Sequence, residues 1–215
     1  MRPANFMKLF LTSSGLSENL SADFFELVGK EPTKMRFYYI PTAVDVEENK
    51  FYTVKSMDDF ADVGINPVWY ALRSKTKNVI ERELADADVI WVGGGNTFYL
   101  LDVARRVGFM DVVEDLVRNK GVIYGGSSAG TILTNPSIDI AGWGHDADPN
   151  KVGLTDLTSF GFLNARTQVH YNPQVHDAML RKAQRDLPLY LLPDGSALRV
   201  DNETVDLLGG AAIMH

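Results

Sequence analysis

Short apolar runs alternate with segments of mixed polarity along most of the chain. The apolar runs predict strands at residues 8–12, 36–40, 88–92 and 121–124, with an ambiguous third strand at residues 66–72. Apolar residues at helical spacing predict helices between them, at residues 20–28, 45–60, 78–85, 98–107 and 111–119. Strands that are almost wholly apolar and alternate with helices are typical of a mostly parallel sheet covered on both faces.

The C-terminal part of the chain has a different pattern. Three apolar runs, at residues 189–192, 197–200 and 205–208, are separated by Pro193-Asp194-Gly195 and by Asp201-Asn202. These separators are turn residues, so we expect antiparallel hairpins near the C-terminus. No repeat or linker interrupts the alternation, and we expect residues 1–215 to form a single three-layer α/β/α domain.

Composition excludes several classes of function. The formal charge of −7 argues against a nucleic-acid partner, and the absence of cysteine excludes disulfides, thiolate metal sites and a cysteine nucleophile. The first residues show no signal peptide, and no apolar run approaches the roughly 18 residues that would cross a bilayer. We therefore expect a cytoplasmic protein without nucleic-acid or membrane partners.

The heptad Gly125-Gly126-Ser127-Ser128-Ala129-Gly130-Thr131 carries the main chemical signal. It follows an apolar strand and precedes a segment that can begin a helix, which is the context of a G-x-S-x-G nucleophile elbow. The small neighbours of Ser128 allow a sharp turn that exposes one hydroxyl. A helix N-terminus directly after it offers free N–H groups to an oxyanion.

A second glycine-rich loop, Gly93-Gly94-Gly95-Asn96-Thr97, follows the preceding predicted strand. Its spacing matches neither a dinucleotide-binding loop nor a P-loop, so we interpret it as an oxyanion loop, with a plain glycine turn as the alternative. In a parallel sheet, both glycine loops would open at the same edge, where ligands usually bind.

A serine nucleophile needs a base, which is most often histidine. Among the four histidines, His170 follows a strand-like run and precedes a loop, which makes it the candidate, whereas a surface role is expected for His176. Several aspartates are eligible as the acid of a triad. A metal site at His145, Asp146 and Asp148 is an alternative use of these residues, although their spacing matches no defined metal loop.

Residues 93–101 and residues 126–130 together resemble the peptidase E (aspartyl dipeptidase) family of serine peptidases. Residues 8–14, 40–43 and 170–172 extend the resemblance, in order, over nearly the whole chain. The resemblance implies a class I glutamine amidotransferase-like, flavodoxin-like α/β fold in which serine replaces cysteine as the nucleophile. The family's nucleophile falls on Ser128 and its histidine falls on His170.

The acid of the triad follows less directly from the resemblance. Asp146 best fits an aspartate between the serine and the histidine, and we take it as the expected acid. Asp194 is the alternative if the acid comes from the C-terminal hairpins.

The expected activity is hydrolysis of short peptides through an acyl-enzyme, with a preference for an N-terminal aspartate. Backbone N–H groups of Gly94, Gly95 and Ala129 would form the oxyanion hole. We expect Asn96 and Arg166 to bind substrate, although Arg166 has an equally ordinary interpretation as a structural or solvated arginine. Neither a cofactor nor a metal is expected, and the oligomeric state, monomer or homodimer, is open.

Two other classes of function share these motifs. An α/β-hydrolase esterase also has a G-x-S-x-G elbow, but it has a further strand between its oxyanion loop and its elbow strand, and no strand fits between Gly95 and Gly121. A binding module of the same fold with an inactive triad is the other alternative, because a fold does not prove an activity.

Overall fold

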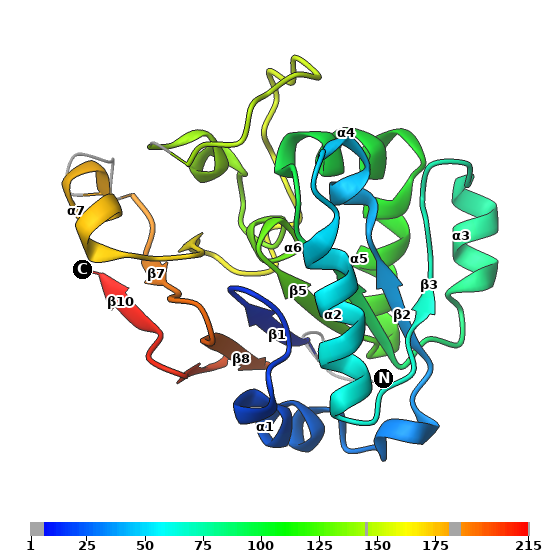
Figure 1. Ribbon diagram of the computed structural model, residues 1–215. Coiled ribbons are helices and arrows are strands. Elements are labelled where there is room, and N and C mark those ends of the chain that lie inside the picture. Colours follow the sequence, from blue (N-terminus) through cyan, green and yellow to red (C-terminus); the bar gives the residue numbers. More distant parts are fainter. Residues whose placement is uncertain (1–6, 145, 181–185, 215) are drawn as a thin grey trace.

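The computed structural model describes residues 7–144, 146–180 and 186–214, and within these ranges a seven-stranded sheet forms the centre of the fold (Figure 1). In spatial order the strands are β3 (Val68–Trp69), β2 (Phe37–Ile40), β4 (Val89–Val92), β5 (Ile123–Ser127), β1 (Lys8–Thr12), β8 (Ala197–Asp201) and β9 (Thr204–Leu208). The first five strands in this order are parallel, and β8 and β9 add an antiparallel hairpin beside β1.

Helices cover both faces of this sheet, which confirms the predicted three-layer α/β arrangement. On one face, Phe37 and Trp91 of the strands pack in a core cluster with α1 (Glu18–Val28) and α2 (Phe51–Asp62). On the other face, the alternate strand residues, such as Ile90, pack against the remaining helices of the main layer. These helices are α3 (Lys77–Glu83), α4 (Thr97–Arg106), α5 (Phe109–Lys120) and α6 (Ala129–Ile132).

Most predicted elements lie close to their observed bounds, and two differ for local reasons. The helix predicted from residue 45 begins at Phe51, because a 3-10 helix (Thr42–Val46) and a short extended segment occupy the start of that range. The ambiguous strand at residues 66–72 is reduced to Val68–Trp69, at the edge of the sheet, where both side chains are exposed. The shorter 3-10 helices are Pro32–Lys34 and Asp139–Gly142.

A second, three-stranded sheet lies beside the first in the described part of the chain. It contains β10 (Ala212–Met214), β7 (Leu189–Leu191) and β6 (Arg166–Gln168), and the helix α7 (Pro173–Leu180) follows β6. The antiparallel hairpin predicted near the C-terminus is confirmed by β8 and β9, but the runs at 189–192 and 197–200 do not form a hairpin, because β7 pairs with β6 and β8 pairs with β1. Residues 192–196 instead connect the two sheets.

The strand pairing brings the segments after β1, β4, β5 and β6 towards one region of the molecule. In the parallel part of the sheet, β1, β4 and β5 end at the same edge. No helix among the described residues is long and apolar enough to span a membrane.

Candidate active site

Ser128 lies at a sharp turn between β5 and α6. Its backbone has φ 52° and ψ −113°, a conformation that non-glycine residues rarely adopt. Such strain persists only where the surroundings enforce it, and it is common at functional sites. The expected elbow geometry is therefore present at Ser128.

Two glycines allow the chain to turn this tightly. A Cβ atom added to Gly130 would lie 2.0 Å from the carbonyl oxygen of Val92, and one added to Gly126 would lie 2.8 Å from the carbonyl carbon of Gly130. Both neighbours are backbone atoms, of β4 and of α6, that cannot move aside without disturbing those elements. The G-x-S-x-G spacing is thus a packing requirement of the strand-to-helix turn.

The end of β1 holds the elbow in place. The backbone oxygen of Thr12 accepts hydrogen bonds from the N–H of Ser128 at 3.2 Å and from Thr131 Oγ1 at 2.7 Å. Thr12 Oγ1 donates in turn to the carbonyl oxygen of Gly126 at 3.0 Å. These buried contacts fix the elbow relative to the strand next to it.

The structure distinguishes the two serines of the heptad. Ser127 is 4% exposed on β5, and its Oγ accepts a hydrogen bond from Trp91 Nε1 at 3.4 Å. Ser128 Oγ instead lies 3.0 Å from Nε2 of His170. Only the second hydroxyl meets a base.

His170 follows β6 and also has a left-handed backbone, with φ 51°. Its N–H donates to Ser13 Oγ at 2.8 Å, and its Nδ1 lies 2.7 Å from Asp194 Oδ1. Ser13 Oγ donates to the same carboxylate oxygen at 3.0 Å. Ser13, a buried residue directly after β1, thus holds both the histidine and the acid, and the sequence analysis had not singled it out.

The carboxylate at Nδ1 of His170 belongs to Asp194 and not to Asp146, the acid preferred from the sequence. The connection between the two sheets carries Asp194 to the histidine because β7 pairs with β6, which precedes His170, while β8 pairs with β1, which precedes Ser13. Asp146 lies on an exposed turn of the long segment before β6. Asp194, the alternative acid in the sequence analysis, thus has the geometry of the third member of a serine–histidine–acid triad.

The glycine loop after β4 lies against Ser128. A Cβ atom added to Gly94 would be 3.1 Å from the Cβ of Ser128 and 3.6 Å from its Oγ. Among the described residues, no acceptor takes a hydrogen bond from the N–H groups of Gly94, Gly95 or Ala129. Backbone N–H donors that lie close to a serine hydroxyl and have no acceptor among these residues can form an oxyanion hole.

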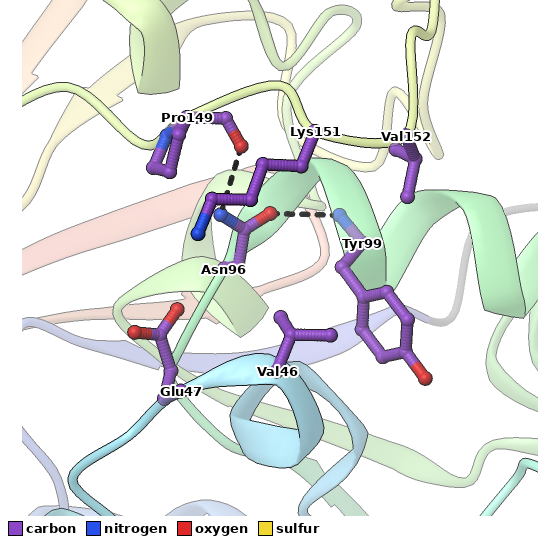
Figure 2. Close-up of a pocket in the computed structure, with 7 residues that line it drawn as sticks. All are labelled: Val46, Glu47, Asn96, Tyr99, Pro149, Lys151 and Val152. Carbon is purple, nitrogen blue, oxygen red and sulfur yellow. Dashed lines mark hydrogen bonds between the residues drawn. The ribbon is translucent and has the colours of Figure 1, made fainter.

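Asn96 is the N-cap residue directly before α4 and is 3% exposed. Its Oδ1 accepts from the N–H of Tyr99 at 2.9 Å, and its Nδ2 donates to the carbonyl oxygen of Pro149 at 3.1 Å. Figure 2 shows it in a pocket between the walls that carry Glu47 and Lys151. The residues that line this pocket are Val46, Glu47, Asn96, Tyr99, Pro149, Lys151 and Val152. Asn96, expected to bind substrate, is thus a helix cap that also lines a pocket next to the glycine loop.

Arg166, the other expected substrate-binding residue, makes its contacts within the protein. Its guanidinium pairs with Asp139 at 3.1 Å and with Asp186 at 2.5 Å, and it lies over the ring of Trp143. Its side chain is only 12% exposed. These contacts favour the structural interpretation that the sequence analysis had left open.

Asp148 is fastened beside the glycine loop. Its Oδ2 accepts from the N–H of Thr97 at 2.8 Å, and its own N–H donates to the carbonyl oxygen of Ala141 at 2.8 Å. Burial raises the pKa of Asp148, although the hydrogen bonds from Thr97 and the charge of His170 act in the opposite direction. The carboxylate of Asp148 is thus partly buried, and it is close enough to His170 to interact with its charge.

The other residues considered from the sequence have different surroundings. His176, expected at the surface, is 5% exposed within α7, and its Nδ1 accepts from the N–H of Asn172 at 3.0 Å. His145 lies outside the described residues. Among those described, no group of three or more histidine, aspartate or glutamate residues is placed to hold a metal ion.

An elbow serine, a histidine and an aspartate joined in series are the arrangement of a hydrolase that acts through a serine nucleophile. Comparison with known proteins agrees with this class. The model of peptidase family S51 matches residues 9–208. An uncharacterized peptidase of Pasteurella multocida is 31% identical over 210 residues, covering 94% of this chain and 97% of the relative.

A probable alpha-aspartyl dipeptidase of Drosophila melanogaster is 33% identical over 140 residues, covering 62% of this chain and 58% of the relative. Among solved structures, a Listeria monocytogenes protein assigned to peptidase E superposes with a TM-score of 0.81 and 26% identity, covering 94% of this chain and 97% of that one. The chain belongs to peptidase family S51, the peptidase E family, and is a peptidase.

Proposed function

We propose that this peptidase is a dipeptidase that hydrolyses peptides with an N-terminal aspartate, using Ser128, His170 and Asp194. The observation that carries the proposal is the continuous contact from Ser128 Oγ through both ring nitrogens of His170 to Asp194 Oδ1. An aspartate at Nδ1 fixes the tautomer that leaves Nε2 free to accept the serine proton, and it stabilises the imidazolium that forms.

The proposed reaction has two stages. Ser128 Oγ attacks the carbonyl carbon of the peptide bond while His170 Nε2 takes the hydroxyl proton and then transfers it to the leaving amine. Water then attacks the acyl-enzyme, losing its proton to His170, and Ser128 is regenerated. Backbone N–H groups of Ala129 and of Gly94 or Gly95 would hold the oxyanion in both stages, and one such donor typically contributes about 2.7–4 kcal/mol.

A matched pair of serine variants tests the nucleophile. Ser128→Ala should lower kcat on dipeptides by a factor on the order of 10⁴ or more with the fold intact. Ser127→Ala should retain most activity, because that side chain faces Trp91. The reverse pattern would contradict the assignment, and so would turnover of p-nitrophenyl esters without turnover of any peptide.

The preference for an N-terminal aspartate is supported by the name of the Drosophila relative. It requires a cation near the site, and we propose Lys151. Lys151 lines the pocket beside Asn96, and no described carboxylate lies within ion-pair distance of its ammonium group, whereas Arg166 is held by two aspartates. The long loop before β6 would then supply specificity to a site built by the sheet.

Substrate profiling tests this preference. The wild type should hydrolyse Asp-Ala faster than Glu-Ala and Ala-Ala, and Lys151→Gln should lower kcat/KM for Asp-Ala about 10-fold, as expected for the loss of one charge-assisted contact. Turnover of Ala-Ala serves as the internal control and should stay within about twofold, because it has no acidic side chain to lose a contact. An equal loss on both substrates would contradict the role of Lys151.

A further inference from the structure

Asp148 is a carboxylate whose position the proposed reaction does not explain. The segment that carries it is attached to the glycine loop at two points: Thr97 donates its N–H to Asp148 Oδ2, and Asn96 donates Nδ2 to the carbonyl oxygen of Pro149. Thr97 is two residues beyond Gly95. The carboxylate is therefore held beside the loop that lies against Ser128.

The charge of this carboxylate has no ion-pair partner in the part of the chain that the structure describes. Among the described residues, no lysine, arginine or histidine nitrogen lies within 4.0 Å of Asp148, in contrast to Asp139, which pairs with Arg166. A partly buried carboxylate without a cationic partner is unfavourable, and such groups are normally paired. Burial also raises the pKa of Asp148, which shows that its negative charge is poorly solvated. The site thus favours a cation that comes from outside the chain.

We infer that Asp148 binds the α-ammonium group of the peptide's N-terminal residue, an inference that rests on the proposed function. In a dipeptide, only the α-carbon separates the α-nitrogen from the scissile carbonyl carbon. A group that binds this ammonium must therefore stand beside the oxyanion loop, where Asp148 is held. The carboxylate accepts from the ammonium and keeps its hydrogen bonds to Thr97.

This assignment gives the two aspartates near His170 different functions. Asp194 orients the imidazole through a direct hydrogen bond, whereas Asp148 recognises the end of the substrate. The recognition restricts cleavage to the first peptide bond, because an acylated terminus or an internal peptide bond offers an uncharged amide at the position of the ammonium. Exopeptidase specificity then follows from one carboxylate and does not require a closed cleft.

The test compares substrates that differ only in this amine. The wild type should hydrolyse Asp-Ala with a higher kcat/KM than N-acetyl-Asp-Ala. Asp148→Asn keeps an oxygen acceptor for the N–H of Thr97 but removes the charge, so kcat/KM for Asp-Ala should fall about 10- to 100-fold, mainly through KM. The value for N-acetyl-Asp-Ala should change less than about threefold, because that substrate makes no charge-assisted contact to lose.

Asp156→Asn is the matched control. Asp156 lies on the same loop, accepts from the N–H of Thr158 at 2.9 Å and is exposed, so its replacement changes the net charge equally without facing the site. It should leave the ratio of the two substrates unchanged. If Asp148→Asn lowers turnover of both substrates equally, or if the wild type hydrolyses both with the same kcat/KM, Asp148 is only a cap of α4 and the inference is overturned.

Binding separates this inference from the proposed function, since it needs no turnover. The Ser128→Ala protein should bind Asp-Ala more tightly than N-acetyl-Asp-Ala in calorimetry, and the additional Asp148→Asn change should abolish the difference. That result supports the inference even if the wild type hydrolyses neither peptide, which would refute the proposed function alone. Equal binding of both peptides by Ser128→Ala overturns the inference whatever the turnover.

Discussion

The elbow at residues 125–131 and the connection at residues 192–196 each place one group of the serine–histidine–aspartate arrangement, but they are held very differently. The elbow is buried, packs backbone against backbone, and is tied to Thr12 by three hydrogen bonds. The connection joins two sheets, and the side chain of Asp194 is 65% exposed with hydrogen bonds to His170 and Ser13.

This difference in burial predicts different effects of substitution in the two regions. Replacing Gly126 or Gly130 of the elbow disturbs the core, because an added Cβ atom would meet backbone atoms there. Replacing Asp194 removes one exposed carboxylate and leaves the core intact. Substitution of these two glycines should therefore lower both stability and activity, whereas substitution of Asp194 should lower activity alone.

The largest expected effect is on the acid. Asp194→Asn should lower kcat by a factor of roughly 10⁴, because an amide no longer selects the required tautomer of His170. Thermal stability should barely change. Asp146→Asn is the companion variant, and its activity should stay within about threefold of the wild type, as is usual for a surface substitution. If Asp146→Asn loses most of its activity while Asp194→Asn stays active, Asp146 is the acid, as preferred from the sequence.

The elbow is tested by Gly130→Ala. The added methyl group would collide with the carbonyl of Val92, so the free energy of unfolding should fall by about 3 kcal/mol or more. Denaturant titration measures this. Gly142→Ala is the control, because its Cβ would meet only the ring of Phe98 at 3.4 Å. If the two variants are equally stable, the elbow is not constrained by packing as described.

Ser13 joins the two regions, and its removal should have an intermediate effect. Ser13→Ala should lower kcat about 10-fold, because Asp194 and the backbone of His170 each lose a hydrogen bond that positions them. The pH profile of kcat/KM should shift as well, which a loss of packing alone would not produce. Ser14→Ala, which removes a contact to the N–H of Gly195 instead, should leave that profile in place.

The smallest effect concerns the pH dependence of stability. The folded-state pKa of Asp148 is raised by burial, so the folded protein binds its proton more tightly than the unfolded chain. The resulting destabilisation is absent at low pH and grows as pH rises through the unfolded and then the folded pKa. Asp148→Asn should therefore gain stability relative to the wild type as the pH rises above the ordinary pKa of an aspartate, about 3.9. A difference that is constant with pH would contradict this.

The sequence predicted the parts of the molecule that are encoded locally. The apolar strands and the G-x-S-x-G turn are readable because burial on both faces and a tight backbone restrict which residues can occur at positions such as Trp91, Gly126 and Gly130. The pair Ser128 and His170 followed from the same logic, since each stands directly after a predicted strand.

The contact between Asp194 and His170 could not be predicted in this way. Pro193-Asp194-Gly195 has the composition of a hairpin turn, and nothing in it shows that β7 and β8 belong to different sheets. That outcome depends on pairing partners far away in the sequence. Arg166 was likewise ambiguous until the positions of Asp139 and Asp186 were known.

The position of β1 between β5 and β8 has a consequence for the timing of folding. Thr12 contacts the elbow across 119 residues of sequence, and Ser13 contacts Asp194 across 181. Contacts of such separation form late, after the cost of closing long loops has been met. A growing chain that already carries Ser128 has not yet made Asp194, so, under the proposed mechanism, peptidase activity should emerge only when synthesis is nearly finished.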